Sequence, residues 1–182
     1  MPLEASLERP DKPELRLWLR LLTCTNLVEG EIRRRLRQDF ATTLPRFDLL
    51  AQLDRHPDGL SLTGLSNRMM VSNGNLTGLV DRLEADGLVE RRPDPNDGRS
   101  TRVALTRAGK SHFDAMTPAH EAWVNDLLDG LSTDEIQRLH DLLGKLKYSA
   151  TEAATCPAWR VCWNPWTSTA WYCRTGSPCR PW

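Results

Sequence analysis

The stretch from residue 72 to 106 changes its hydrophobic period halfway along, and this change limits the folds that the chain can adopt. At about 100° per residue, the apolar side chains of residues 72–86 gather on one face of a helix, namely Leu76, Leu79, Val80 and Leu83. After Gly87, the segments 88–92 and 102–106 have alternating or β-branched character, and the Asn-Asp-Gly between them is typical of a tight turn. The sequence therefore predicts a helix followed directly by a two-stranded hairpin.

The segments before this stretch are mostly helical in pattern. A first helix is expected over about 13–41, because apolar residues recur there at helical spacing: Leu15, Trp18, Leu22, Val28, Ile32 and Leu36. Thr43 and Pro45 predict the cap and first turn of a second helix through Leu53. Residues 60–70 predict a short extended entry and a helix capped by Ser61 or Thr63, with Leu62, Leu65 and Met69 turned inward. Ser72 then caps the helix over 72–86, and the pair of helices is a candidate helix-turn-helix.

The polar side of the helix over 72–86 contains two glycines. Gly74 and Gly78 lie opposite the apolar face, beside Asp81 and Ala85 and flanked by Asn75, Thr77 and Arg82. Glycine costs about 1 kcal/mol relative to alanine inside a helix, so a merely solvent-facing helix gains nothing from it. Small residues suit a helix whose backbone enters a DNA major groove. The alternative is an ordinary surface helix.

Charge is concentrated in the predicted hairpin. Between Arg91 and Lys110 there are six cations and two anions, a net charge of +4 in a chain whose formal net charge is zero. Such asymmetry is typical of a phosphate-binding surface, and an arginine at a hairpin tip can enter a minor groove. A solvated charged loop is the alternative.

Composition limits the other classes of function. With 182 residues and 40% hydrophobic content, the chain suits one domain, or one domain with a dimerisation element. The first twenty residues lack the apolar core of a signal peptide and no run is long enough for a membrane helix, so a cytoplasmic protein without a membrane association is expected. Nucleophile elbows, phosphate-binding glycine loops and paired metal ligands are absent from the sequence, so neither an enzyme nor a metal or cofactor is expected.

Residues 149–182 differ in composition from the rest. Four of the five cysteines and five of the seven tryptophans lie there, all within 156–182, a stretch with several prolines and no helical or strand period. We interpret this segment as a tail outside the fold. The alternatives are a metal or disulfide module, although the C-x5-C-x10-C-x5-C spacing lacks close ligand pairs, and an extension that folds on its own dimer.

The stretch VSNGNLTGLVDRLEADGLVERRPDPNDGRSTRVALTRAG closely resembles the winged helix-turn-helix core of the MarR family of bacterial transcriptional regulators. Its most specific part is Asp97-x-Arg99-x-x-x-Val103-x-Leu105-Thr106, preceded by residues 81–84 and 87–89. The resemblance covers about 13–148 in layout and 60–110 in motif. It implies a mainly α fold with a small β-wing: a winged helix-turn-helix DNA-binding lobe over 43–106, and a helical dimerisation region over 1–42 and 107–148.

The same resemblance implies a homodimer on a pseudo-palindromic double-stranded operator. Arg99 is then the wing-tip arginine in the minor groove, and Asp97 holds its direction by a charge-assisted hydrogen bond. The other DNA contacts that we expect are Ser72, Asn73, Gly74, Asn75, Thr77, Arg82 and Arg102.

Two apolar stripes are candidates for the dimer contact that the resemblance implies. The first has 3-4-3-4-4 spacing and comprises Phe113, Met116, His120, Trp123, Leu127 and Leu131. The second follows a capping box, Ser132-x-x-Glu135, and comprises Ile136, Leu139, Leu143 and Leu146. Such stripes are often ordinary core, but few other elements are available to cover them within one chain, so an intermolecular role is favoured.

The resemblance also implies a repressor that a small aromatic carboxylate or phenol releases from DNA. The residues that we expect to form the effector pocket are Trp18, Leu22, Thr25, Asn26, Arg46, Phe47, His120 and Trp123. The alternative is a redox sensor at Cys24, although the two tyrosines, Tyr148 and Tyr172, are poorly placed to assist a thiol. The simpler interpretation of Cys24 is a buried structural cysteine.

Overall fold

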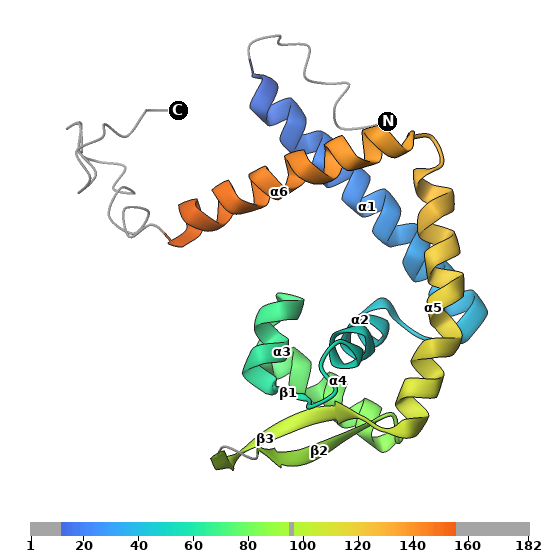
Figure 1. Cartoon of the computed structure of the whole chain (residues 1–182), viewed down its shortest axis with the longest axis vertical. Helices are drawn as coiled ribbons and strands as arrows, with labels where there is room; N and C mark the ends of the chain where they lie inside the picture. The colour runs from blue at the N-terminus through green and yellow to red at the C-terminus, as the bar shows by residue number, and fades with distance from the viewer. Residues whose placement is uncertain (1–11, 95–96, 156–182) are drawn as a thin grey trace, which may run out of the picture. The chain divides into compact units, whose positions relative to one another are not determined.

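The computed structural model describes residues 12–94 and 97–155, and the chain divides into two compact units, 1–127 and 128–182. Figure 1 labels the elements, which in chain order are α1 (Pro13–Phe40), α2 (Leu44–Asp54), β1 (Leu60–Ser61), α3 (Leu62–Met69), α4 (Asn73–Ala85), β2 (Val89–Asp94), β3 (Asp97–Leu105), α5 (Arg107–Leu128) and α6 (Thr133–Thr155). The predicted fold class, mainly α with a small β-wing, is confirmed. Helix α6 includes residues 149–155 of the predicted tail, whose remaining residues lie outside the described part of the chain.

The small sheet has one strand more than the sequence predicted. Its order is β1-β3-β2, and both pairings are antiparallel. Leu60 of β1 pairs with Val103, while Val89 of β2 pairs with Leu105 at the base of the hairpin. The sequence predicted an extended entry at residue 60, but its pairing with β3, which is distant in the sequence, depends on tertiary contact that no local pattern contains. This third strand anchors the wing to the start of α3.

The helix boundaries follow local chemistry. Ser61 caps α3, since its side-chain oxygen accepts a hydrogen bond from the Gly64 amide at 3.1 Å. Thr43 and Ser72 occupy the predicted cap positions of α2 and α4, but neither side chain makes a capping hydrogen bond. Gly87 follows α4 with a φ of +72°, a conformation that favours glycine, and the chain turns there into β2.

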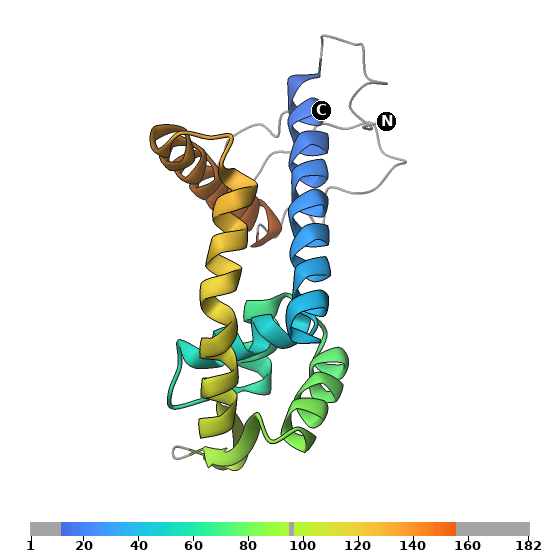
Figure 2. The same cartoon turned by 90° about the vertical axis from the view of Figure 1, so that its right-hand side faces the viewer.

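The hydrophobic core joins α2, α3, α4 and the sheet beneath the C-terminal end of α1, and Figures 1 and 2 show this lobe from two sides. All four apolar residues predicted for the inner face of α4 are buried, namely Leu76, Leu79, Val80 and Leu83. Leu65 of α3 and Val103 of β3 are fully buried as well. The prediction of an inner and an outer face for α4 is therefore confirmed. No helix within 12–94 or 97–155 combines the length and apolar character needed to span a membrane.

The apolar stripe on α5 belongs to the core of its own chain. Phe113, Met116 and Trp123 are buried, and the Trp123 ring lies 5.9 Å from that of Phe40 at the end of α1. For these three residues the expected intermolecular role is wrong, because the C-terminal half of α1 and helix α2 already cover them. Leu131 lies beyond the end of α5 and is exposed.

Gly109 is fixed by the packing of α5 against the turn after α4. A Cβ at this position would lie 1.9 Å from the carbonyl oxygen of Leu88. We therefore expect Gly109→Ala to lower the free energy of unfolding by about 1–3 kcal/mol, since the backbone has to shift. Gly78→Ala is the matched control, because its Cβ meets only a flexible arginine end at 3.6 Å; it is expected to raise stability by up to about 1 kcal/mol. Urea unfolding measures both, and equal stability of the two variants would contradict the packing.

Candidate nucleic-acid interface

Helix α4 presents a polar face that contains two glycines. Gly74, Asn75, Thr77 and Arg82 lie outside the core, and Gly74 is exposed. A Cβ at Gly74 would meet no atom within 4 Å, and one at Gly78 would meet only the Nη1 of Arg82. Packing within the described chain therefore gives no reason for either glycine. A bare helix backbone on this side suits close approach by another molecule.

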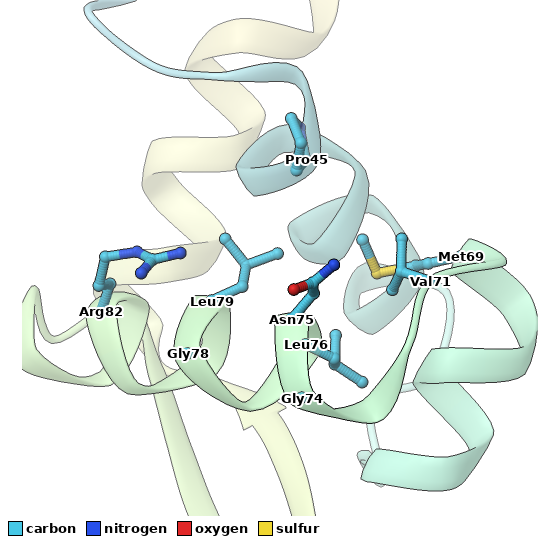
Figure 3. Close-up of a pocket in the computed structure, with 9 residues that line it drawn as sticks. All are labelled: Pro45, Met69, Val71, Gly74, Asn75, Leu76, Gly78, Leu79 and Arg82. Atoms are coloured by element: carbon cyan, nitrogen blue, oxygen red, sulfur yellow. The ribbon is translucent and has the colours of Figure 1, made fainter.

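A shallow groove of about 400 Å³ follows α4. Figure 3 shows the side chains of Asn75, Leu79 and Arg82 rising from α4 on the side of Pro45, whereas Gly74 and Gly78 leave the helix surface bare. Met69 and Val71 close one end of the groove. Thr77 does not point its hydroxyl hydrogen outward in this structure, because it donates to the Asn73 carbonyl at 2.9 Å. The amide of Asn75 and the guanidinium of Arg82 thus provide hydrogen-bonding groups beside a bare backbone.

The wing arginines are more strongly paired than their sequence suggests. Arg91 bonds Asp81 and Glu84 of α4, and Arg92 bonds Glu90 in its own strand. Arg102 donates from Nε to Asp94 at 2.6 Å and reaches the Gly59 carbonyl at 3.4 Å. Within residues 91–110, whose net charge is +4, Arg102 is therefore paired with an acid of the same segment, while Arg91 and Arg92 are paired with acids that precede it. An Arg102 contact with DNA would have to share the guanidinium with Asp94.

The two residues of the wing motif, Asp97 and Arg99, begin β3. Asp97 stands opposite Asp94 in the strand register, next to a bulge. The expected hydrogen bond between the Asp97 and Arg99 side chains lies outside the described part of the structure.

The structure brings together three of the predicted effector residues. The rings of Phe47 and His120 are stacked with centroids 4.5 Å apart, and Trp123 meets His120 edge-on at 6.5 Å. Burial lowers the pKa of His120, so its imidazole is favoured in the neutral form at pH 7. Arg46, next to Phe47, pairs with Asp86 after α4. Arg46 thus joins α2, which carries Phe47, to the end of α4.

The other predicted effector residues lie elsewhere. Trp18, Leu22, Thr25 and Asn26 are exposed on the N-terminal half of α1, and the Trp18 side chain is 58% exposed. At about 1.5 Å per residue, Trp18 is about 33 Å along the helix from Phe40, which contacts Trp123. Within one chain the two groups do not line one pocket. Cys24 is exposed among them, so its interpretation as a buried cysteine is wrong for the single chain.

The comparisons with known proteins agree with this fold and surface. Residues 42–101 match the model of the MarR family. The chain is 33% identical to the transcriptional activatory protein BadR of Rhodopseudomonas palustris over 132 residues, which covers 70% of this chain and 75% of BadR. It is 30% identical to the regulator PecS of Dickeya dadantii, covering 77% of this chain and 86% of PecS.

Solved structures show the same relationship. A MarR family regulator from Silicibacter pomeroyi is 36% identical, with a TM-score of 0.65 over 75% of this chain and 94% of its own. The fold is also that of a mutant MarR from E. coli, solved with operator DNA, at 24% identity and a TM-score of 0.66 over 76% of this chain and 98% of that one. The chain belongs to the MarR family, and it is a DNA-binding transcriptional regulator rather than an enzyme.

Gly78→Ala also tests the bare face of α4. The added methyl group leaves the fold intact but separates the helix from a closely approaching DNA groove. We expect operator affinity to fall about tenfold or more, because overpacking a tight contact costs about 1–3 kcal/mol. Fluorescence anisotropy with operator DNA measures this. Gly30→Ala on α1, where a Cβ meets nothing within 4 Å, is the control and should bind normally. Unchanged binding by Gly78→Ala would show that the bare face does not meet DNA.

Proposed function

We propose that the chain acts as a homodimeric repressor on a pseudo-palindromic operator and that a small aromatic carboxylate or phenol releases it. One observation carries the proposal. Helix α4 buries its whole apolar face and leaves outward a glycine-bearing polar face, followed directly by a β-wing. A helix of this kind fits a major groove, and the wing fits the adjacent minor groove. The structural neighbour from E. coli was solved in complex with operator DNA.

The proposed DNA contacts divide between the two elements. Ser72, Asn73, Gly74, Asn75, Thr77 and Arg82 act from α4, and its N-terminus adds amides that favour phosphate. Asp97, Arg99 and Arg102 act from the wing. Repression needs nothing beyond occupancy of the operator. Named relatives of the chain differ in this respect, since BadR is an activatory protein and IacR of Pseudomonas putida is a repressor.

Exposed apolar surface supports the homodimer. On α6, considered by itself, Ile136, Leu139, Leu143 and Leu146 are each 39–43% exposed along one face. On α1, Leu15, Trp18, Leu22 and Leu27 are exposed as well. Contiguous apolar surface of this kind marks an interface. A second copy covers both faces in the proposed dimer.

The proposed effector site is centred on the aromatic cluster of Phe47, His120 and Trp123, with Arg46 beside it as a carboxylate partner. In the proposed dimer, the exposed residues of α1 from the partner copy complete the wall of this effector site or form a second wall of it. These residues are Trp18, Leu22, Thr25 and Asn26. A structural neighbour with the same fold, CouR from Rhodococcus jostii, was solved bound to p-coumaroyl-CoA, at 23% identity and a TM-score of 0.65.

Replacing Arg99 by alanine tests the wing. We expect weaker operator binding, because one cation that neutralises DNA phosphate is lost. The slope of log affinity against log salt concentration should fall in magnitude by about one unit. Anisotropy titrations on DNA from upstream of its own gene, at several salt concentrations, measure both quantities. Affinity and slope equal to those of the unchanged protein would rule out the wing contact.

Leu143→Glu on α6 tests the homodimer. An unpaired carboxylate in the interface should raise the dimer dissociation constant about 100-fold or more. Sedimentation at a series of protein concentrations measures this constant. Lys145→Glu makes a larger change of charge on the opposite side of α6 and should leave the dimer intact. A dimer equally stable in both variants, or a monomeric unchanged protein, would contradict the proposal.

A panel of aromatic acids added to the operator complex tests the effector. Release by one acid, weakened by Arg46→Gln, is the expected result. The alternative sensor is Cys24, which its exposure favours. Release only by peroxide, with no response in Cys24→Ser, would replace the aromatic effector with a thiol switch.

A further inference from the structure

One side chain joins the wing to the recognition helix. The Nη1 of Arg91, on β2, bonds Glu84, and its Nη2 bonds Asp81, both on α4. The backbone amide of Arg91 also donates to Glu84 Oε1 at 3.2 Å. The two carboxylates are one helical turn apart, so the planar guanidinium spans them with separate nitrogens. We call Arg91, Asp81 and Glu84 the α4–β2 clamp.

The position of the clamp determines what it restrains. The turn between α4 and β2 is already fixed at its base, where Leu83 and Val89 are buried and the Leu88 amide bonds the Leu83 carbonyl at 2.9 Å. Arg91 lies two residues further along β2, toward the tip of the wing. A small rotation at the base becomes a large displacement at the tip, and the clamp opposes that rotation. Isolated surface ion pairs stabilise a fold little, whereas a bonded guanidinium with a backbone contact fixes geometry.

The clamp also neutralises charge. Asp81 lies on the outward side of α4 with Gly74 and Gly78, and its side chain is 56% exposed. A free carboxylate there would repel DNA phosphates. Binding to Arg91 offsets that repulsion without removing the acidic groups. The sequence keeps two acids beside the proposed DNA face, which is costly unless they have a structural task.

We propose that Arg91 is a positioning residue for operator recognition: through Asp81 and Glu84 it holds the wing at a fixed angle to α4, so that both elements engage the operator together. This inference rests on the proposed DNA face. It differs from a direct phosphate contact by Arg91 and from simple charge screening, because both of those make the acids harmful to binding.

Glu84 gives a test, because the direction of the change in operator affinity differs between positioning and the rival roles. Glu84→Gln removes a negative charge near DNA. If the clamp only screened charge, or if Arg91 bound phosphate directly, this variant would bind the operator more tightly. Positioning predicts the opposite, a loss of about tenfold, in the range of coupling measured for bonded pairs. Glu90→Gln is the matched control, because Glu90 bonds Arg92 within β2 and does not reach α4. It removes the same charge and should bind the operator as tightly as the unchanged protein or more tightly.

Further measurements separate a fixed wing angle from a change of net charge. Binding to an unrelated duplex should hardly change in Glu84→Gln, because non-specific attraction needs net charge rather than a fixed wing angle. Arg91→Lys keeps the positive charge but loses the planar guanidinium that bonds both acids, so it should weaken operator binding as Glu84→Gln does. Adding Glu84→Gln to Arg91→Lys should then reduce operator affinity little further. Thermal unfolding confirms that each variant is folded.

Operator binding by Glu84→Gln that equals or exceeds that of the unchanged protein would overturn the positioning role. So would an equal loss of operator and non-specific binding, or additive losses in the double variant. Failure of the proposed DNA face has a different outcome, since Gly78→Ala and Arg99→Ala would then leave operator binding unchanged.

Discussion

The burial of one face of α4 is the constraint on which the rest of the structure depends. Leu76, Leu79, Val80 and Leu83 are the inner face, and their removal from water fixes the rotation of the helix about its axis. Once that rotation is set, Gly74, Asn75 and Arg82 necessarily lie outside the core. The functional surface is thus a consequence of core packing, and neither can change without the other.

The same packing determines where the wing begins. Gly87 turns the chain at the end of α4, and Val89, the first residue of β2, enters the core. Gly109 then allows α5 to pass directly over the Leu88 carbonyl, so the helix that leaves the sheet is held against the turn. The aromatic cluster of Phe47, His120 and Trp123 lies along α5, and the Arg46–Asp86 pair joins α2 to the end of α4. A ligand in this region has a short physical connection to the recognition helix, provided that it binds one helix arrangement better than the other.

Sequence patterns predicted much of this arrangement, and their failures have physical reasons. The period of Leu76 to Leu83 and the turn at residues 96–98 are local properties, so the helix and hairpin were both predicted. Periodicity shows that one side of a helix is apolar but not what covers it, which is why Phe113, Met116 and Trp123 were assigned to a dimer contact and instead lie in their own core. The pairing of β1 with β3 and the bonds of Arg91 to α4 join residues through the tertiary fold. No spacing rule contains them.

Hydroxyl-radical footprinting tests most directly whether α4 and the wing contact the operator together in a two-fold dimer. On a duplex from upstream of its own gene, we expect two half-sites whose centres are about one helical turn apart, each flanked by protected minor-groove positions where the wings lie. Uniform protection without phasing, or a single protected half-site with no flanking minor-groove contact, would contradict this expectation.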